Sequence, residues 1–199
     1  IVLGEGTLEV ENTDFTVTGN SIFLGNSTSE FNDNLTFIGD LIYFENAIIN
    51  IDSAQINIPM EFVAQYSWIG GDNAQFTVTN TTINLENGKL GGGVMGASQL
   101  SLHNTHFQSQ SGIALTMGFS DQSDINVEYC TGGMEFIVSD SASLDIDNSA
   151  GLIIWHTFQE GSTADIVFPP SNSLIPYASD VTSYNFSGDA MGVDGLNYT

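Results

Sequence analysis

The chain has 199 residues and is strongly acidic, because 24 aspartates and glutamates stand against one lysine and no arginine, for a formal net charge of −23. Lys and Arg are the residues that neutralise phosphate, so this composition excludes binding to DNA, RNA or an anionic lipid surface. It also excludes enzyme mechanisms that need an arginine. A hydrophobic content of 41% is enough for one domain with a full core.

The apolar runs of the chain are short, and the longest, such as residues 152–155, suit buried strands. We therefore expect no membrane span and no direct membrane insertion. Cys130 is the only cysteine, so no internal disulfide can form. The chain opens on Ile1 without a basic and apolar leader, which predicts a removed signal peptide or a domain of a longer protein. Strong negative charge with one tryptic site favours a secreted or cell-surface location.

From Leu8 onward the chain repeats one pattern, in which turn residues and a polar residue precede an apolar–polar–apolar triplet. We call the first apolar residue of each copy its marker. The markers are Leu8, Leu35, Ile56, Phe76, Leu100, Ile125, Leu144 and Ile166. They follow one another at roughly 20 to 25 residues, a period typical of solenoids.

Two further short strands are predicted after many of the markers. The second strand is expected at residues 15–17, 42–44 and 83–85, and the third at residues 22–24, 49–51 and 113–115. Gly, Asn, Ser and Asp turns separate these segments, and no stretch has a helical apolar period with caps. The sequence thus predicts an all-β solenoid of about eight coils with three short strands per coil.

This repeat resembles the right-handed parallel β-helix, or pectin-lyase-like, family over roughly residues 8 to 168. The resemblance rests on the repeat and not on a catalytic motif. It implies that each coil stacks on the previous one at about 4.8 Å, which makes three parallel sheets around one dry core. Phe76, Leu100 and Ile125 are then expected to lie one above the next.

Residues that tolerate a left-handed backbone recur four positions after many markers, where a corner between sheets is expected. They are Asn12, Gly39, Asn80, Asn104 and Asn148. Pro169 and Pro170 then interrupt the repeat, because proline is excluded from a sheet interior. We expect residues 1–168 to form the β-helix and residues 169–199 to form a C-terminal cap or a linker. Residues 1–3 are expected to close the other end or to act as a docking strand.

The sharpest group of polar side chains is expected on the outward side of the first strand in each coil. Stacking places His103, Glu128 and Asp147 in one column, with Ser101, Asn126 and Asp145 beside it. Glu128, Asp145 and Asp147 are candidate oxygen ligands for Ca²⁺, and His103 and Asn126 are candidate ligand-binding residues. The alternatives are an acid–base pair for glycoside hydrolysis and a merely solvated polar face. Enzymes of the resembling family also line this face with Arg or Lys, and here Lys89 stands in a loop, so no catalytic residue is predicted.

Two further groups of residues, a set of aspartates and a set of aromatic side chains, are weaker candidates for binding. Asp52 is expected to stack near Asp72, and Asp121 near Asp140, either as turn-forming side chains or as a calcium bridge. Four aromatic residues could form a sugar-stacking platform, although core packing is the favoured interpretation. These residues are Tyr66, Trp68, Trp155 and Phe158.

Two hypotheses about function follow from the sequence. The first is an extracellular structural or adhesive module without enzymatic activity, such as a stalk, an adhesin segment or a self-associating fibre subunit. Its expected partners are other copies of the chain, joined end to end, or neighbouring domains of a longer surface protein. The second is a glycan-active or glycan-binding β-helix that uses Glu128, Asp145 and Asp147.

Overall fold

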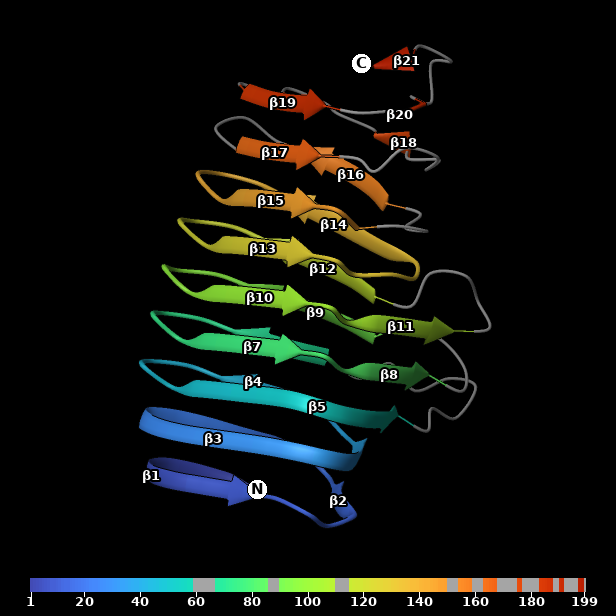
Figure 1. Ribbon diagram of the computed structural model, residues 1–199. Coiled ribbons are helices and arrows are strands. Elements are labelled where there is room, and N and C mark those ends of the chain that lie inside the picture. Colours follow the sequence, from blue (N-terminus) through green and yellow to red (C-terminus); the bar gives the residue numbers. More distant parts are fainter. Residues whose placement is uncertain are drawn as a thin grey trace.

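The structure is a computed structural model that describes residues 1–58, 67–85, 90–109 and 115–149, with only the backbone of Glu135, and the backbone of β16 to β21 between residues 154 and 198. The chain forms a parallel β-solenoid, and the described residues contain no helix. Figure 1 shows the chain passing from left to right in front of the axis while it rises toward the C-terminus, which is a right-handed winding. The expected fold class is therefore confirmed.

The first face of the solenoid is a ladder of parallel strands at the front of Figure 1. Its strands are β1 (Val2–Val10), β3 (Ser21–Ile38), β5 (Ile48–Ile58), β7 (Gln75–Thr79), β10 (Gln99–His103), β13 (Asp124–Glu128), β15 (Ser143–Asp147), β17 (Thr163–Val167) and β19 (Ser183–Ser187). Strands β1, β3 and β5 bend at corners, so parts of them also belong to the neighbouring faces.

The other two faces complete the coils, and the second face has described strands only as far as β11 (His106–Ser109). The second face consists of β2 (Phe15–Thr18), β8 (Thr82–Leu85) and β11 (His106–Ser109), with the C-terminal parts of β3 and β5. The third face consists of β4 (Leu41–Tyr43), β6 (Ser67–Gly70), β9 (Leu90–Val94), β12 (Leu115–Phe119), β14 (Met134–Val138), β16 (Ile154–Phe158) and β18 (Ile175–Pro176), with the N-terminal parts of β1 and β3. Strands β20 (Ala190–Met191) and β21 (Asn197–Tyr198) form an antiparallel pair.

The core consists of inward side chains that stack from coil to coil. Phe76, Leu100 and Ile125 are in register on β7, β10 and β13, as the sequence predicted, and each is at most 1% exposed. Trp68 packs edge-on against Phe76 with ring centroids 5.0 Å apart. Full burial of such side chains stabilises the fold by about 1.5–3 kcal/mol each, so the columns supply most of its stability.

Three of the predicted stacking positions were wrong. Leu35 and Ile56 lie on the second face, in register with Phe15 and Ile83, and not below Phe76. Ser29 and Ile49 take the expected places on the first face. The error arose because β3 and β5 cross a corner without a break, and the triplets on either side of that corner look alike.

The third error is a shift of two residues near the C-terminus. Ile166 pairs with Ile146, whereas Ala164 is the residue in register with Leu144. The period-2 alternation hides this shift, because moving a strand by two residues keeps the same side chains inward. Parallel stacking of the backbone also continues beyond Pro169 and Pro170, since β19 pairs with β17. A boundary between a β-helix of residues 1–168 and a cap or linker of residues 169–199 stays a prediction.

Two corners flank the first face, and both use left-handed backbone. At the corner toward the second face, this conformation occurs at Asn12, Asp33, Ser53, Asn80, Asn104, Tyr129 and Asn148, with φ between 47° and 75°. At the corner toward the third face it occurs at Gly25, Glu45, Asp72, Gly96, Asp121 and Asp140, with φ between 56° and 70°. The expected asparagine corner is confirmed, except that Gly39 belongs elsewhere: it packs on Gly19, between the second and third faces.

The described part of the chain has no helix of the length and hydrophobicity that a membrane crossing requires.

Candidate functional site

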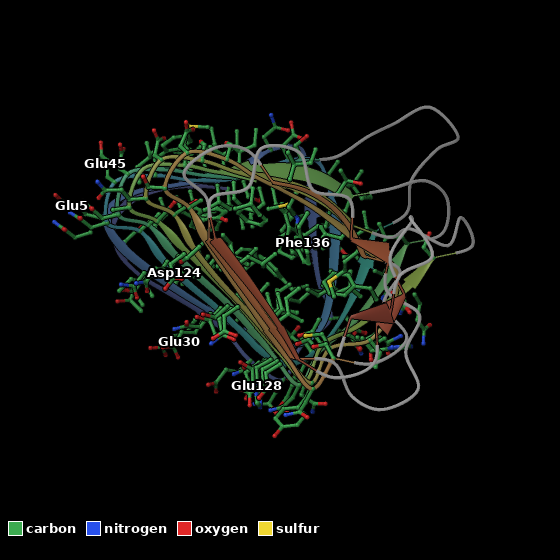
Figure 2. The ribbon with its side chains drawn as sticks, turned by 90° about the horizontal axis from the view of Figure 1, so that it is seen from above. Glu5, Glu30, Glu45, Asp124, Glu128 and Phe136 are labelled. Carbon is green, nitrogen blue, oxygen red and sulfur yellow. The ribbon has the colours of Figure 1, made fainter. Side chains whose placement is uncertain are left out.

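Carboxylates are concentrated on the first face and its two corners. On the face lie Glu9, Glu11, Glu30, Asp52, Asp124, Glu128, Asp145 and Asp147, and at the corners lie Glu5, Asp33, Glu45, Asp72, Asp121 and Asp140. Among carboxylates whose side chains the structure describes, only Asp14 and Asp40 lie elsewhere. Figure 2 shows Glu5 and Glu45 at one corner, Glu30 and Glu128 along the face, and Phe136 inside. We call this surface the acidic face.

The predicted column of His103, Glu128 and Asp147 is present on the acidic face. His103 on β10 is in register with Glu128 on β13, which is in register with Asp147 on β15. The Nδ1 atom of His103 lies 3.1 Å from the Oε2 atom of Glu128, and the two side chains are 44% and 36% exposed. A pair this open to solvent adds at most about 1 kcal/mol to stability. Its side chains are therefore free to serve a binding role at little cost to the fold.

Asn126 and Asp145 form the neighbouring column, in which Asn126 is also in register with Ser101. The five predicted site residues are thus brought onto one patch of three strands. Among the described residues, no three His, Cys, Asp or Glu side chains are grouped closely enough to hold a metal ion. Calcium binding by Glu128, Asp145 and Asp147, and ligand binding by His103 and Asn126, stay predictions.

Tyr129 is a residue of this patch that the sequence reasoning missed. It occupies a left-handed corner position with φ 53°, where the neighbouring coils carry Asn104 and Asn148, and its side chain is 50% exposed. Its ring packs edge-on against His103 with centroids 5.6 Å apart. A bulky side chain is strained in this conformation, and such strain is often found at functional positions. The signal was available, because Tyr129 stands four residues after the marker Ile125.

Acidic side chains at the other corner bind backbone from the coil below. The Gly25 N–H donates to Oε2 of Glu45 at 2.7 Å, and the Glu45 N–H donates to Oδ2 of Asp72 at 3.3 Å. The Gly96 N–H donates to Oδ2 of Asp121 in the same way, at 3.0 Å. At these corners the carboxylates therefore accept from N–H groups of the neighbouring coil, whereas capping of their own turn stays a prediction.

The two predicted aspartate pairs have different outcomes. Asp121 and Asp140 occupy equivalent corner positions in successive coils, and the Ser141 N–H donates to the carbonyl of Asp121 at 2.9 Å. The pairing of Asp52 with Asp72 was wrong, because Asp52 lies on β5 in register with Thr79. The cause is the misplaced marker Ile56, because the position of Asp52 was counted from that residue.

The second face has a different chemistry, dominated by amides and hydroxyls. A shallow depression on it is lined by Asp14, Phe15, Thr16, Asn34, Thr36, Gln55 and Asn57. The side-chain amide of Asn84 donates to that of Asn57 at 3.0 Å, and the amide of Asn34 donates to Asp14 at 2.9 Å. These contacts continue along the axis like those of the core, so the outer side chains are also organised in columns.

The remaining candidates for chemistry are buried. The thiol of Cys130 is fully buried and lies 3.4 Å from the carbonyl oxygens of Leu102 and Glu128. Burial raises the pKa of Cys130 to about 11, so this thiol is a poor nucleophile at neutral pH. Trp68 is a core residue at 2% exposure, as favoured from the sequence. Tyr66 and the side chains of Trp155 and Phe158 lie outside the described residues.

Comparisons with models of known families, with curated proteins and with solved structures find no match to this chain, so its site is interpreted from its own geometry.

Proposed function

We propose that this chain is a structural and adhesive module of a secreted or cell-surface protein, without enzymatic activity. The observation that supports this function most is that most of the carboxylates with described side chains lie on the acidic face of a parallel stack. In-register strands hold neighbouring carboxylates about 4.8 Å apart along the axis in two groups, one on β1, β3 and β5 and one on β13 and β15. Strands β7 and β10, which lie between the two groups, carry no carboxylate.

The internal bonding of the solenoid suits a load-bearing role. Hydroxyl and thiol groups behind the asparagine corner link successive coils: the hydroxyl of Thr105 donates to the Val78 carbonyl at 3.2 Å, and the hydroxyl of Ser149 accepts from the Cys130 N–H at 3.0 Å. Side-chain amides of Asn104 and Asn80 bond across the same corner at 2.8 Å. Each coil is therefore fixed to the next by its backbone and by its side chains.

The proposed partners are other copies of the chain or neighbouring domains, with Ca²⁺ as a bridge between carboxylates. Calcium takes carboxylate oxygens in flexible arrangements, and exposed rows of carboxylates on two molecules can supply them together. Strand β1 pairs only with β3 among the described strands, and Ile1, Leu3, Leu8 and Phe15 are only partly buried at that end. Such an end supports joining of copies end to end.

Binding to an immobilised layer of the same protein tests this function. We expect a calcium-dependent part of the binding, which is present in about 2 mM Ca²⁺ and absent in EDTA, because weak extracellular calcium sites have dissociation constants of roughly 0.1–1 mM. A triple variant, Glu128→Gln with Asp145→Asn and Asp147→Asn, should lose most of this binding. Asp14→Asn, a matched change on the second face, should keep it. Binding that is equal in all variants and unaffected by EDTA would contradict the proposal.

A second candidate function is action on or binding of glycans at the same patch. It is favoured by the 3.1 Å contact between His103 and Glu128 beside the exposed ring of Tyr129, since acids next to an aromatic ring suit a sugar. Screening neutral and acidic polysaccharides for new reducing ends separates the two functions. Cleavage that Asp145→Ala abolishes would establish the second function and overturn the first.

A further inference from the structure

The outward side of the third face has two uncharged columns, which are apolar except at Ser120 and Ser139. The first column contains Val2, Ile22, Ile42, Ile69, Gly93, Gly118 and Ile137. The second contains Leu24, Phe44, Gly71, Met95, Ser120 and Ser139. Val2 is 74% exposed, Met95 41% and Ile137 37%, whereas most other large apolar side chains in the described part of the chain are buried. We call these two columns the apolar face.

Bulky and small residues are unevenly distributed on the apolar face. Val2, Ile22, Ile42 and Ile69 occupy four successive coils, and Gly93 and Gly118 follow in the next two. A Cβ added to Gly93 would meet only the Gly118 carbonyl oxygen at 3.6 Å, and one added to Gly118 would meet only the Gly92 oxygen at 3.9 Å. Both are ordinary contacts, so the fold itself leaves room for a side chain at these glycines.

Charge makes this face the side on which two copies can approach. No residue of the two columns is charged, whereas the acidic face lies around the corner marked by Glu5 and Glu45 (Figure 2). With one lysine and no arginine in 199 residues, copies cannot pair through the acidic face by salt bridges. Contact through the apolar face points the acidic faces outward, where water and salt screen them.

We propose that two copies of the chain associate back to back through their apolar faces, in antiparallel orientation. Seven coils at about 4.8 Å and three outward positions give a contact of roughly 34 by 15 Å, which is about 500 Å² per copy. The third position is a polar margin beside the two apolar columns, with Asp40, Ser67 and Thr116, and Glu135 is next in register. The total of about 1,000 Å² reaches the lower limit for specific protein interfaces.

Antiparallel packing is favoured by the order of residues in the first column. Reversing one copy about Ile69 places Ile22 opposite the partner's Gly118 and Ile42 opposite the partner's Gly93. Each isoleucine then enters the space above a glycine, and Ile69 meets the partner's Ile69 on the two-fold axis. Parallel packing would set isoleucine against isoleucine at one end and leave glycine against glycine at the other. A two-fold interface must be self-complementary, and the antiparallel order matches isoleucine to glycine at the inner positions of the first column. At its ends Val2 meets the partner's Ile137, and in the second column Phe44 meets the partner's Met95.

Filling a glycine tests the interface without disturbing the fold. Sedimentation equilibrium should show a concentration-dependent dimer for the unmodified chain in 0.5 M NaCl. Gly93→Ile should weaken the dimer at least about tenfold, because the new side chain collides with the partner's Ile42. Thr77→Ile, a matched change on the acidic face, should leave the dissociation constant unchanged. Circular dichroism and thermal unfolding of both variants check that they fold. A monomeric unmodified chain, or association that Gly93→Ile leaves unchanged, would overturn the proposal.

Cross-linking tests the orientation separately. Ile69→Cys should join two copies through a bismaleimide with a spacer near the about 10 Å that separates packed sheets. Ile22→Cys should not, because the two equivalent positions are then four coils, or roughly 19 Å, apart. The native Cys130 is fully buried and should give no background. Equal cross-linking at both positions would overturn the antiparallel orientation.

Discussion

At the scale of single residues, the corner beside the acidic face shows how position restricts residue type. Six of its seven described left-handed positions carry Asn, Asp or Ser, and the seventh carries Tyr129. Asn tolerates this backbone because its short polar side chain bonds locally, whereas a tyrosine has no such compensation. Tyr129 thus costs stability at a place where its ring contacts His103 and borders the predicted site.

Replacing Tyr129 with the residue of the neighbouring coils should separate stability from binding. Tyr129→Asn is expected to raise the free energy of unfolding by about 1 kcal/mol, because it relieves left-handed strain. The same variant should weaken any ligand binding at His103 and Glu128. Urea denaturation measures the first effect, and the calcium-dependent binding assay measures the second. Lower stability in Tyr129→Asn would mean that the contact with His103 outweighs the strain.

Cys130 predicts a specific dependence of stability on alkaline pH. Burial raises the pKa of this thiol from 9.0 to about 11, so the folded state keeps its proton longer than the unfolded state. The stability from this group is complete below pH 9 and is lost as pH rises to about 11, at a cost of about 3 kcal/mol. Cys130→Ser should unfold less readily than the unmodified chain over this range. Burial also raises the pKa of Tyr43. Because Tyr43 is present in both the unmodified chain and the Cys130→Ser variant, its titration does not affect the comparison.

The serine in this variant has a precedent in the fold. Thr105 and Ser149 occupy the equivalent corner positions of the adjacent coils and donate to backbone carbonyls as the thiol does. Cys130→Ser should therefore change stability at neutral pH by less than about 1 kcal/mol. Parallel urea titrations at pH 7 and pH 10.5 make the comparison. Equal losses of stability in both proteins at high pH would show that the thiol does not titrate as expected.

At the scale of strands, periodicity predicted most strand segments, but it did not always predict their face or alignment. The expected second strand at residues 42–44 belongs to the third face, and the expected third strand at residues 49–51 belongs to the first. The markers from Phe76 to Leu144 stack as predicted, because each of those coils has one first-face strand bounded by turns on both sides. Leu35 and Ile56 did not, because β3 and β5 continue across a corner at which Asp33 and Ser53 stand in place of asparagine. The apolar pattern does not reveal a corner that lacks asparagine. The triplets before and after such a corner then look alike, and either could be assigned to the first face.

Adjacent glycines in β9 should respond oppositely to substitution. Gly92 points inward, where an added Cβ would overlap the Trp68 carbonyl oxygen and lie 2.6 Å from the Met117 sulfur. Gly92→Ala should therefore destabilise the fold by about 2 kcal/mol or more. Gly93→Ala should be neutral or stabilise it slightly, because its Cβ has room and glycine weakens strands. Thermal unfolding of the two single variants is the measurement, and equal effects would contradict the assigned strand orientation.

At the scale of the whole molecule, the three faces have three chemistries. Composition alone predicted the negative charge but not its placement, because the side of the solenoid on which a carboxylate lies depends on the stacking register. The patch of His103, Asn126, Glu128, Asp145 and Asp147 could be predicted since its three strands are regular. The apolar face could not, because its members come from the third strand of each coil, which varies most in position along the chain.

Charge segregation predicts that salt stabilises the fold. The screening length is about 30 Å at 0.01 M salt, which is longer than the distance between carboxylates on neighbouring strands, so these carboxylates repel one another. At 1 M salt it is about 3 Å, and most of this repulsion is screened. Raising NaCl from about 10 mM to 500 mM should therefore raise Tm by roughly 5 °C. The triple variant of Glu128, Asp145 and Asp147 should start from a higher Tm and gain less from salt. A Tm that salt leaves unchanged would show that repulsion on this face is negligible.

Stacking by columns also bears on how such a molecule can change length. Because the chemistry of each side is carried by one or two positions per coil, duplication of a complete coil extends the acidic and the apolar side together. It adds about 4.8 Å of height and leaves the cross-section as it was. The length of the solenoid can then evolve through the number of coils, and its surface chemistry can evolve independently through substitutions within the coils.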